Sequence, residues 1–371
     1  MKNGLPSRHT LTFMSLEFLW YIPNTVEPGH RGDDVADGWA NLRRSTELAQ
    51  IVEDHGWGGA LIGTGWGRPD AFTLATALAA RTTRFQPLVA IRPGYWQPAH
   101  FASAAATLDL LSEGRLLVNI VSGPDNLAAY GDVEGDQAER YARTREFLQL
   151  LRQLWTKENV TFRGRYFRVE GSTVTPRPFG AADGRHPRLY FGGASAAAEQ
   201  VAATEADVQL FWGEPLDGIA ERIGRLQDRA RSLGRVHPPL EFGLRITTLV
   251  RDTTEEAWRD AEAKVAQLAE AAGQPRADGL WDQAVGQQRL RGLAERGEVL
   301  DSCLYTTPGR FGGGGAGTTW LVGSHDEVAA ALRKYRDLGV THFVLSDTPY
   351  QHEAARVGDQ LLSRLRDPVA G

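Results

Sequence analysis

The stretch Arg115–Gly123 reads RLLVNIVSG, and a segment of helical period follows it at Tyr141–Trp155. Its nearly continuous apolar run is typical of a strand in a parallel sheet that is buried on both faces. The run HFVLS at His342–Ser346, with a helical segment after it, repeats the arrangement. Repeated strand–helix units of this kind predict a (β/α)8 TIM barrel, a fold of the α/β class. The strands are expected at Leu16–Pro23, Gly59–Thr64, Phe85–Pro93, Arg115–Gly123, Arg188–Ser195, Asp207–Glu214, Glu241–Arg251 and His342–Asp347.

Two stretches interrupt this alternation. Thr156–Pro178 alternates polar and apolar residues around two glycines, which predicts an inserted β-hairpin near 156–178. The stretch 272–317 is long and polar and ends in the glycine run FGGGGAG. A loop of that length in a compact domain is usually functional, so we expect a mobile lid with the glycines as its hinge. The alternative is that the glycines only permit a close approach of the backbone.

The composition is that of an ordinary globular chain, with 42% hydrophobic and 23% charged residues among 371. The net charge of −5 gives no reason to expect nucleic acid or a membrane as a partner. The single cysteine, Cys303, excludes an internal disulfide and a thiolate metal cluster. The N-terminus shows no apolar core of a secretory signal, so we expect a cytoplasmic protein. Residues 1–15 are expected to form a flexible tail and residues 16–371 a single domain.

The carboxyl ends of the strands, where TIM barrels carry their active sites, are rich in Trp, Gly, Arg and amide residues. They are poor in histidine and carboxylates, which argues against a metal site and against catalysis by paired carboxylates. The chain also has no H-E-x-x-H, P-loop or G-x-S-x-G motif. The chemistry is therefore expected to come largely from a bound cofactor.

Two glycine-rich stretches follow predicted strands. Gly192-Gly193-Ala194-Ser195 closes a strand and opens a helix, so its amides and the serine hydroxyl form a candidate phosphate site. The alternative is a tight turn with a serine that only caps the helix. The stretch GTGWG at 63–67 has no dinucleotide-binding unit around it, and we interpret it as a turn that shapes the floor of the pocket.

Three polar side chains need partners in this arrangement. Asn119 lies inside an apolar strand, where either a flavin ring edge or a neighbouring strand would satisfy its amide. Tyr141 either donates to a phosphate or simply packs. Arg245, in the strand EFGLRITTLV, faces the interior or the mouth of the barrel. Since an unpaired buried arginine is costly, it requires either an acidic partner or an anionic substrate.

Motifs at the strand ends resemble, in their order and spacing, those of the bacterial-luciferase-like flavin monooxygenases. Among these the chain is most similar to the two-component FMNH2-dependent alkanesulfonate monooxygenases, from about Leu16 to the C-terminus. The motifs are FLWYIPN (18–24), ALIGTG (60–65), LVAIRP (88–93), VNIVSG (118–123), LYFGGAS (189–195), FWGEP (211–215), FGLRI (242–246) and VGQQR (285–289).

The resemblance implies a homodimer or homotetramer that binds FMN as FMNH2, supplied by a separate NAD(P)H-dependent flavin reductase. With O2 it would oxygenate a small organosulfur substrate, and an alkanesulfonate would yield an aldehyde and sulfite. The expected catalytic residues are Asn119, Trp212 and Arg245. The expected cofactor-binding residues are Thr64, Asn119, Ser122, Tyr141, Gly192, Gly193, Ala194 and Ser195. The expected substrate-binding residues are Trp20, Arg68, Trp212, Arg245, Thr247, Arg310, Thr348 and Tyr350.

Several positions depart from the alkanesulfonate pattern, although the flavin features persist. The family's histidine after the first strand and cysteine after the second are replaced by Thr25 and Arg68. Its histidine two residues beyond Arg245 is Thr247, its lid arginine is Gly313, and its residues around the last proline are Thr348 and Tyr350. Arg68 and Arg310 are candidates for restoring the lost positive charge.

Three alternatives therefore remain beside the sulfonate hypothesis. The same flavin chemistry would serve a sulfone, a heterocycle or a natural-product intermediate. Related barrels bind the deazaflavin F420, which would make the protein an F420-dependent oxidoreductase. A catalytically silent, flavin-binding accessory subunit is the third alternative.

Overall fold

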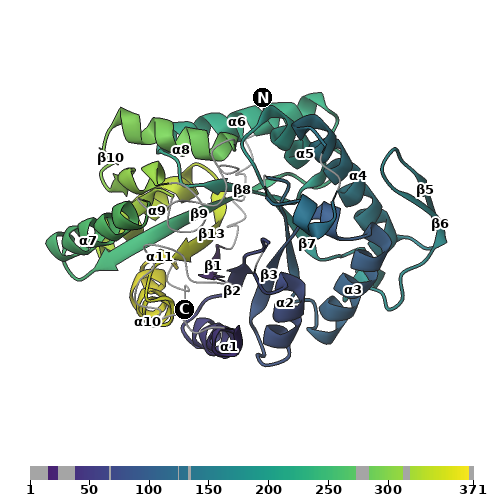
Figure 1. Cartoon of the computed structure of the whole chain (residues 1–371), viewed down its shortest axis with the longest axis horizontal. Helices are drawn as coiled ribbons and strands as arrows, with labels where there is room; N and C mark the ends of the chain where they lie inside the picture. Colours follow the sequence, from purple (N-terminus) through teal and green to yellow (C-terminus); the bar gives the residue numbers. More distant parts are fainter. Residues whose placement is uncertain are drawn as a thin grey trace, which may run out of the picture.

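The computed structural model describes residues 16–23, 38–66, 68–123, 125–132, 135–272, 284–311 and 318–366. Among these residues, eight parallel strands close into a barrel, because β8 pairs with β9 and completes the ring (Figure 1). The prediction of a (β/α)8 barrel is confirmed. In the order of their pairing, the strands are β9 (Glu241–Arg251), β13 (Val340–Ser346), β1 (Glu17–Ile22), β2 (Gly59–Ile62), β3 (Gln86–Ile91), β4 (Leu117–Ile120), β7 (Arg188–Gly192) and β8 (Val208–Trp212).

Helices surround the barrel and cover the outer faces of the strands (Figure 1). Several begin at a side chain that accepts a hydrogen bond from a backbone amide, such as Asp70 before α2 and Ser324 before α9. The helices around the ring are α1 (Gly38–Asp54), α2 (Ala71–Ala79), α3 (Pro98–Leu111), α4 (Gln137–Thr156), α5 (Ala196–Glu205), α6 (Leu216–Ser232), α9 (His325–Asp337) and α10 (Tyr350–Val357). A π-helical turn (Gly358–Leu362) and the short α11 (Ser363–Leu365) follow α10.

The direction of each strand side chain decides what it can reach. Successive side chains of a strand alternate between the inside of the barrel and the helix layer, and residues in register share a side. Trp212 is in register with Arg245 on the neighbouring strand, and the Arg245 guanidinium lies 4.5 Å from the centre of the Tyr21 ring. Tyr21 therefore faces the interior of the barrel, and Trp20 faces the helices.

The first predicted insertion is confirmed. β5 (Val160–Arg163) and β6 (Arg168–Ser172) form an antiparallel hairpin that projects from the body beyond α3 and α4 (Figure 1). The carboxylate of Glu146 on α4 accepts hydrogen bonds from the backbone amides of Arg165 and Tyr166 in the turn of the hairpin, at 2.8 and 2.9 Å. These bonds tie the hairpin to the barrel.

The second insertion, the stretch 272–317 that was expected to form a lid, contains a helix and two short strands. Its described part holds α8 (Val285–Arg296), β10 (Val299–Leu300) and β11 (Leu304–Tyr305). β11 pairs with β12 (Trp320–Ser324). β12 in turn pairs with the carboxyl-terminal half of β9 and packs beside α7 (Thr254–Ala272). Strands of two residues leave no readable alternation in the sequence, which is why these pairings were not predicted. The glycine run 312–317 and the tail 1–15 lie outside the described residues.

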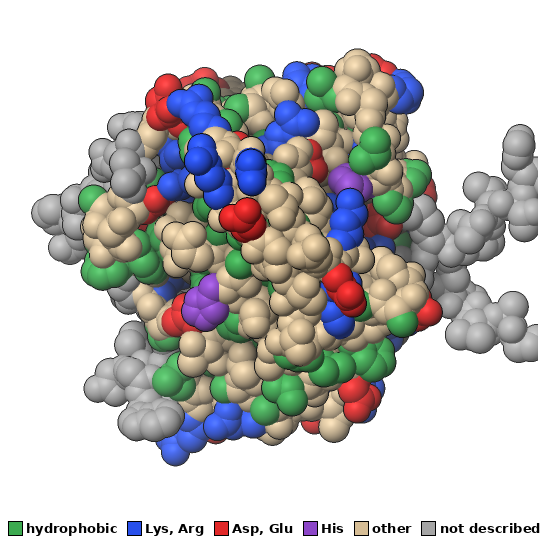
Figure 2. All heavy atoms as spheres, turned by 90° about the vertical axis from the view of Figure 1, so that its right-hand side faces the viewer, with side chains coloured by type: hydrophobic (Ala, Val, Ile, Leu, Met, Phe, Trp, Pro, Cys, Tyr) green, Lys and Arg blue, Asp and Glu red, His purple; other side chains and the backbone are tan. Residues whose placement is uncertain are grey.

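The exterior carries charges of both signs. On the face shown in Figure 2, basic and acidic side chains are interspersed among uncharged atoms rather than gathered in a field of one sign. Among the described residues, no helix combines the length and the apolarity that crossing a bilayer requires.

Candidate active site

A cavity of about 240 Å³ opens at the carboxyl ends of the barrel strands. Its walls come from β2, β3, β4, β7, β8 and β9, from α4 and α6, which contributes Arg222, and from the start of α8. The structure thus brings together every residue predicted to bind the cofactor or to act in catalysis. These are Thr64, Asn119, Ser122, Tyr141, Gly192, Gly193, Ala194, Ser195, Trp212 and Arg245.

One wall is the turn Gly192–Ser195, called the α5 turn from here on, which leads from β7 into α5. Gly193 has φ +143°, and a Cβ there would lie 2.6 Å from the Cβ of Ala198, so glycine is required. The Ser195 hydroxyl caps α5 by accepting from the Ala198 amide at 3.2 Å. The capping role is therefore present, and the turn still presents the amino end of a helix to the cavity, where an anion is stabilised.

Tyr141 reaches the α5 turn from α4, a helix that Asp136 caps at its start. Its ring packs on Phe191 with the ring centres 6.3 Å apart. Burial raises the pKa of the Tyr141 phenol, and the Ser195 hydroxyl offsets part of that rise. The phenol therefore stays a neutral hydrogen-bond donor beside the helix terminus.

β4 contributes Asn119 and Ser122. Asn119 is 7% exposed, and its Oδ1 atom has no hydrogen-bond partner within the described part of the molecule. A bond from this oxygen to a neighbouring strand, the alternative interpretation, is thus not formed. Ser122 is hydrogen-bonded to Thr144 of α4 at 2.7 Å. A buried acceptor without a partner is costly, so Asn119 points to a donor that a ligand supplies.

Arg245 closes the opposite wall beside Trp212. It is 6% exposed, and its Nη1 atom has no partner among the residues that the structure describes. Glu214, an acid that also lines the cavity just after β8, is bound by Arg222 at 2.9 Å and by Arg289. The guanidinium rests on the Tyr21 ring, which supports the charge without cancelling it.

Four other predicted substrate-binding residues are not among those that line the cavity. Tyr350 is buried, and its ring centre is 6.1 Å from that of Tyr21, the ring on which Arg245 rests. The hydroxyl of Thr247 lies 3.4 Å from that of Ser346. The remaining two are Thr348, whose carbonyl accepts from Lys264 at 2.7 Å, and Arg68, which packs against Gly63 and Gly65.

Two predicted substrate-binding residues lie elsewhere. Trp20 is fully buried on the helix side of β1, with its ring centre 4.8 Å from that of Trp57. Every position of FLWYI is apolar, so the sequence could not show which residues face inward, and Tyr21 takes the interior place. Arg310 is exposed, and its Nη2 donates to the Ala294 carbonyl near the end of α8 at 3.1 Å. Neither placement supports contact with a ligand in the cavity.

Sequence reasoning missed several residues of the wall. Arg92 is buried at the end of β3, where Nη1 donates to the Gly123 carbonyl at 2.6 Å and Nε lies 3.1 Å from Asp125. A charged residue directly after the apolar run LVAI was the available signal. α8 was expected only as part of a lid, yet its Gly286 packs against Trp212, since a Cβ there would lie 3.2 Å from the indole.

The remaining candidates for chemistry are inert. Cys303 is buried, and burial raises the pKa of its thiol to about 11, so it is not a thiolate at neutral pH. Among the residues described, no group of three or more His, Cys, Asp or Glu side chains is placed to hold a metal ion.

A second cavity, of about 400 Å³, lies at the other end of the barrel, before β9. Its arginines serve the fold: Arg152 Nη2 donates to the Glu205 carbonyl at 2.7 Å, and Arg235 donates to the carbonyls of Ala203 and Ala206. Both cap the end of α5. The polar groups of this cavity therefore hold α4 and the loop before β9 against the end of α5.

Solved structures of similar fold include the EDTA monooxygenase from Chelativorans sp. BNC1, with TM-score 0.75 and 19% identity over 95% of this chain and 93% of that one. A riboflavin lyase, solved with modified FMN and riboflavin, has TM-score 0.72 and 21% identity over 95% and 92%. An F420-dependent secondary alcohol dehydrogenase has TM-score 0.68 and 16% identity over 95% and 100%. These likenesses show the fold alone. The family model for luciferase-like monooxygenases, however, matches residues 16–342, and the chain therefore belongs to the luciferase-like monooxygenase family.

Proposed function

We propose that this protein is the FMNH2-dependent monooxygenase of a two-component system and that it oxygenates a small anionic organosulfur compound. An alkanesulfonate, cleaved to an aldehyde and sulfite, is the first candidate. The observation that carries the proposal is a pair of buried polar atoms without partners, Asn119 Oδ1 and Arg245 Nη1, in a cavity that also holds a helix-terminus anion site.

The residues of the cavity fit FMN. The α5 turn and the neutral Tyr141 phenol form a cradle for a phosphate, and Gly193 leaves room for close approach of the backbone. Asn119 Oδ1 requires an N–H donor, which the ring edge of a reduced flavin provides. When bound, the reduced cofactor would supply the two electrons that O2 chemistry requires.

The protein's own residues would bind and orient the reactants. Ser195 and Tyr141 would anchor the phosphate, and Asn119 would set the orientation of the ring by accepting its proton in a hydrogen bond. α8 covers the site through Gly286 against Trp212, which limits the access of water.

Arg245 supports an anionic head group on the substrate. Its guanidinium is fixed, buried and without an acidic partner in the described part of the chain, so an anion that binds Nη1 would complete it. A sulfonate or carboxylate matches the planar fork of donors. A neutral sulfone or heterocycle would leave the charge uncompensated, which is why we place sulfonates first.

The proposal includes partners that act on the free cofactor. An NAD(P)H-dependent flavin reductase would deliver FMNH2, and the cytoplasm would provide both NAD(P)H and a reducing environment. We further propose a homodimer or homotetramer, as the resemblance implies.

The test is an assay with the purified protein, a flavin reductase, NADH, FMN and O2 on a panel of alkanesulfonates. Release of sulfite with the matching aldehyde is the expected result. Turnover of only neutral sulfones or heterocycles would overturn the substrate class. Binding of F420 in preference to FMNH2, or flavin binding with no substrate-dependent consumption of O2 on any panel, would overturn the monooxygenase assignment.

A further inference from the structure

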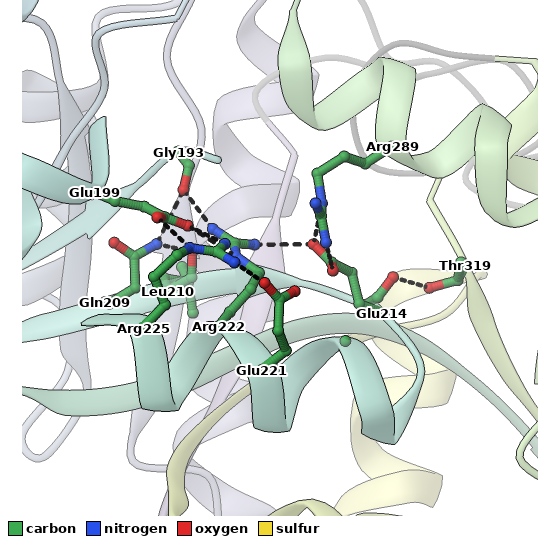
Figure 3. A network of polar contacts seen from close by, with 12 residues as sticks. Gly193, Glu199, Gln209, Leu210, Glu214, Glu221, Arg222, Arg225, Arg289 and Thr319 are labelled. Carbon is green, nitrogen blue, oxygen red and sulfur yellow. Dashed lines mark hydrogen bonds and ion pairs between the residues drawn. The ribbon is translucent and has the colours of Figure 1, made fainter. Parts of the chain in front are cut away.

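A buried arginine lies directly beneath the α5 turn. Arg222, on α6, is 2% exposed, and its Nη2 donates to the Gly193 carbonyl at 2.7 Å (Figure 3). Gln209, on β8, is fully buried and donates from Nε2 to the same carbonyl at 3.3 Å. One carbonyl of the turn thus accepts two side-chain hydrogen bonds.

The hydrogen bonds to the Gly193 carbonyl also orient the N–H group of Ala194. In a planar trans peptide the C=O and the following N–H point in opposite directions. The Gly193 carbonyl and the Ala194 N–H belong to one such unit, and Ala194 lines the cavity. By holding the carbonyl, Arg222 and Gln209 therefore set the direction of the Ala194 N–H on the opposite side. Gly193 itself, at φ +143°, gives the peptide freedom to rotate that other residues lack.

Arg222 is itself held from two sides (Figure 3). Its Nε lies 3.3 Å from Glu199 Oε1 and its Nη1 lies 2.9 Å from Glu214 Oε1. Burial alone would raise the pKa of Glu199, but hydrogen bonds and charges from Arg225 and Arg222 hold it below its ordinary value. Carboxylates thus bind Arg222 on two sides, and the guanidinium cannot swing away from the turn.

The second carboxylate extends this contact to α8. Glu214 is also bound by Arg289, whose Nε lies 3.0 Å from Glu214 Oε1. The hydrogen bond to Glu214 raises the pKa of Arg289. The helix that covers the cavity and the turn that opens α5 are therefore tied to the same buried carboxylate and arginine.

We infer that Arg222 is a positioning residue for a phosphate-bearing ligand: together with Gln209 it orients the Gly193–Ala194 peptide so that its N–H faces the anion. The inference rests on the proposed binding of FMN at the α5 turn. It predicts that the two side chains govern the preference of the protein for FMN over riboflavin, which differ only in the phosphate, and not the affinity for the ring.

The test is an anaerobic titration of reduced FMN and reduced riboflavin, read by quenching of tryptophan fluorescence. In Arg222→Gln we expect the preference for FMN to fall about tenfold or more, as for one charge-assisted hydrogen bond. Gln209 is uncharged and does not line the cavity. Its replacement in Gln209→Met removes one hydrogen-bond donor, and we expect the preference for FMN to fall severalfold. Riboflavin affinity should stay unchanged in both.

Arg225→Gln is the matched control. Arg225 lies one turn further along α6 and binds Glu199 at 2.9 Å, but it bonds neither Gly193 nor Glu214 in the contacts that the structure describes. It should keep the preference for FMN. If Arg222→Gln fails to fold, the double variant Arg222→Met with Glu214→Gln replaces the buried ion pair by neutral groups and carries the same test.

The outcomes separate the inference from the proposed function. A wild-type protein that prefers FMN, with Arg222→Gln and Gln209→Met equal to it, overturns the positioning role and leaves FMN binding intact. Loss of preference in Arg222→Gln alone assigns the effect to charge and overturns the orientation argument. A wild-type protein that binds neither flavin, or both equally, overturns the phosphate site and the inference with it.

Discussion

The two ends of the cavity satisfy their polar groups in opposite ways. Beneath the α5 turn, Arg222 is bound by two carboxylates and a carbonyl, and Glu214 has a second arginine. At the other end, Asn119 Oδ1 and Arg245 Nη1 are buried without partners in the described residues. The first arrangement is complete before a ligand arrives and stays rigid. The second lacks partners until a ligand supplies them. We therefore expect substrate recognition and the reaction to take place beside Asn119 and Arg245.

The largest effect is expected at Arg245. Arg245→Met should lower turnover of an anionic substrate by about 100-fold or more, since losing one partner of a buried charge pair costs about 2–5 kcal/mol. FMNH2 affinity should stay nearly constant. Arg245→Lys should fail almost as badly if the contact is bidentate.

Melting temperature separates this role from an internal one. Because no acid among the described residues pairs with Arg245, the methionine variant should melt at the wild-type temperature or above it. A variant that melts lower and still turns over the substrate would show that Arg245 supports the fold, and the contrast between the two ends would be lost.

Ser195→Ala tests the complete end. The variant loses a hydrogen bond to the phosphate, and we expect FMN affinity to fall about tenfold while riboflavin affinity is unchanged. It should also lose about 1 kcal/mol of stability, because Ser195 caps α5.

Ser324→Ala is the control for that stability loss. Ser324 caps α9 in the same way, with Glu327 completing a capping box, and it does not line the cavity. Its variant should lose similar stability and keep its affinity for FMN. Equal losses of FMN affinity in both variants would mean that a loosened barrel, rather than a lost contact, weakens binding.

Asn119→Ala tests the incomplete end from the flavin side. We expect FMNH2 affinity to stay within a few fold, because a single neutral hydrogen bond contributes about 1 kcal/mol. The ratio of oxygenated product to hydrogen peroxide should fall about fivefold, since the ring is no longer held by the Asn119 carbonyl oxygen. A ratio equal to that of the wild type would remove Asn119 from the catalytic residues.

The same contrast explains how far the sequence could be interpreted. The barrel strands were predictable because buried parallel strands are apolar runs such as VNIV, and glycine before a capping serine indicates an anion-binding turn. The sequence could not predict which side each residue of FLWYI faces, because every position there is apolar. The hydrogen bond from Arg222 to Gly193 could not be predicted either. It joins positions 29 residues apart on separate elements and depends on how α6 packs.

The smallest effect is expected from pH at Tyr141, and its sign follows from burial. An ordinary tyrosine is half ionised near pH 10, where its negative charge would repel a phosphate. Burial holds the pKa of Tyr141 above that value, so the phenol remains a donor. FMN affinity should therefore change in parallel between pH 8 and 10 in the wild type and in Tyr141→Phe, which binds a few fold more weakly throughout. A loss of affinity above pH 9 that the phenylalanine variant does not share would show that the phenol ionises, and that the α5 end is less completely desolvated than its contacts indicate.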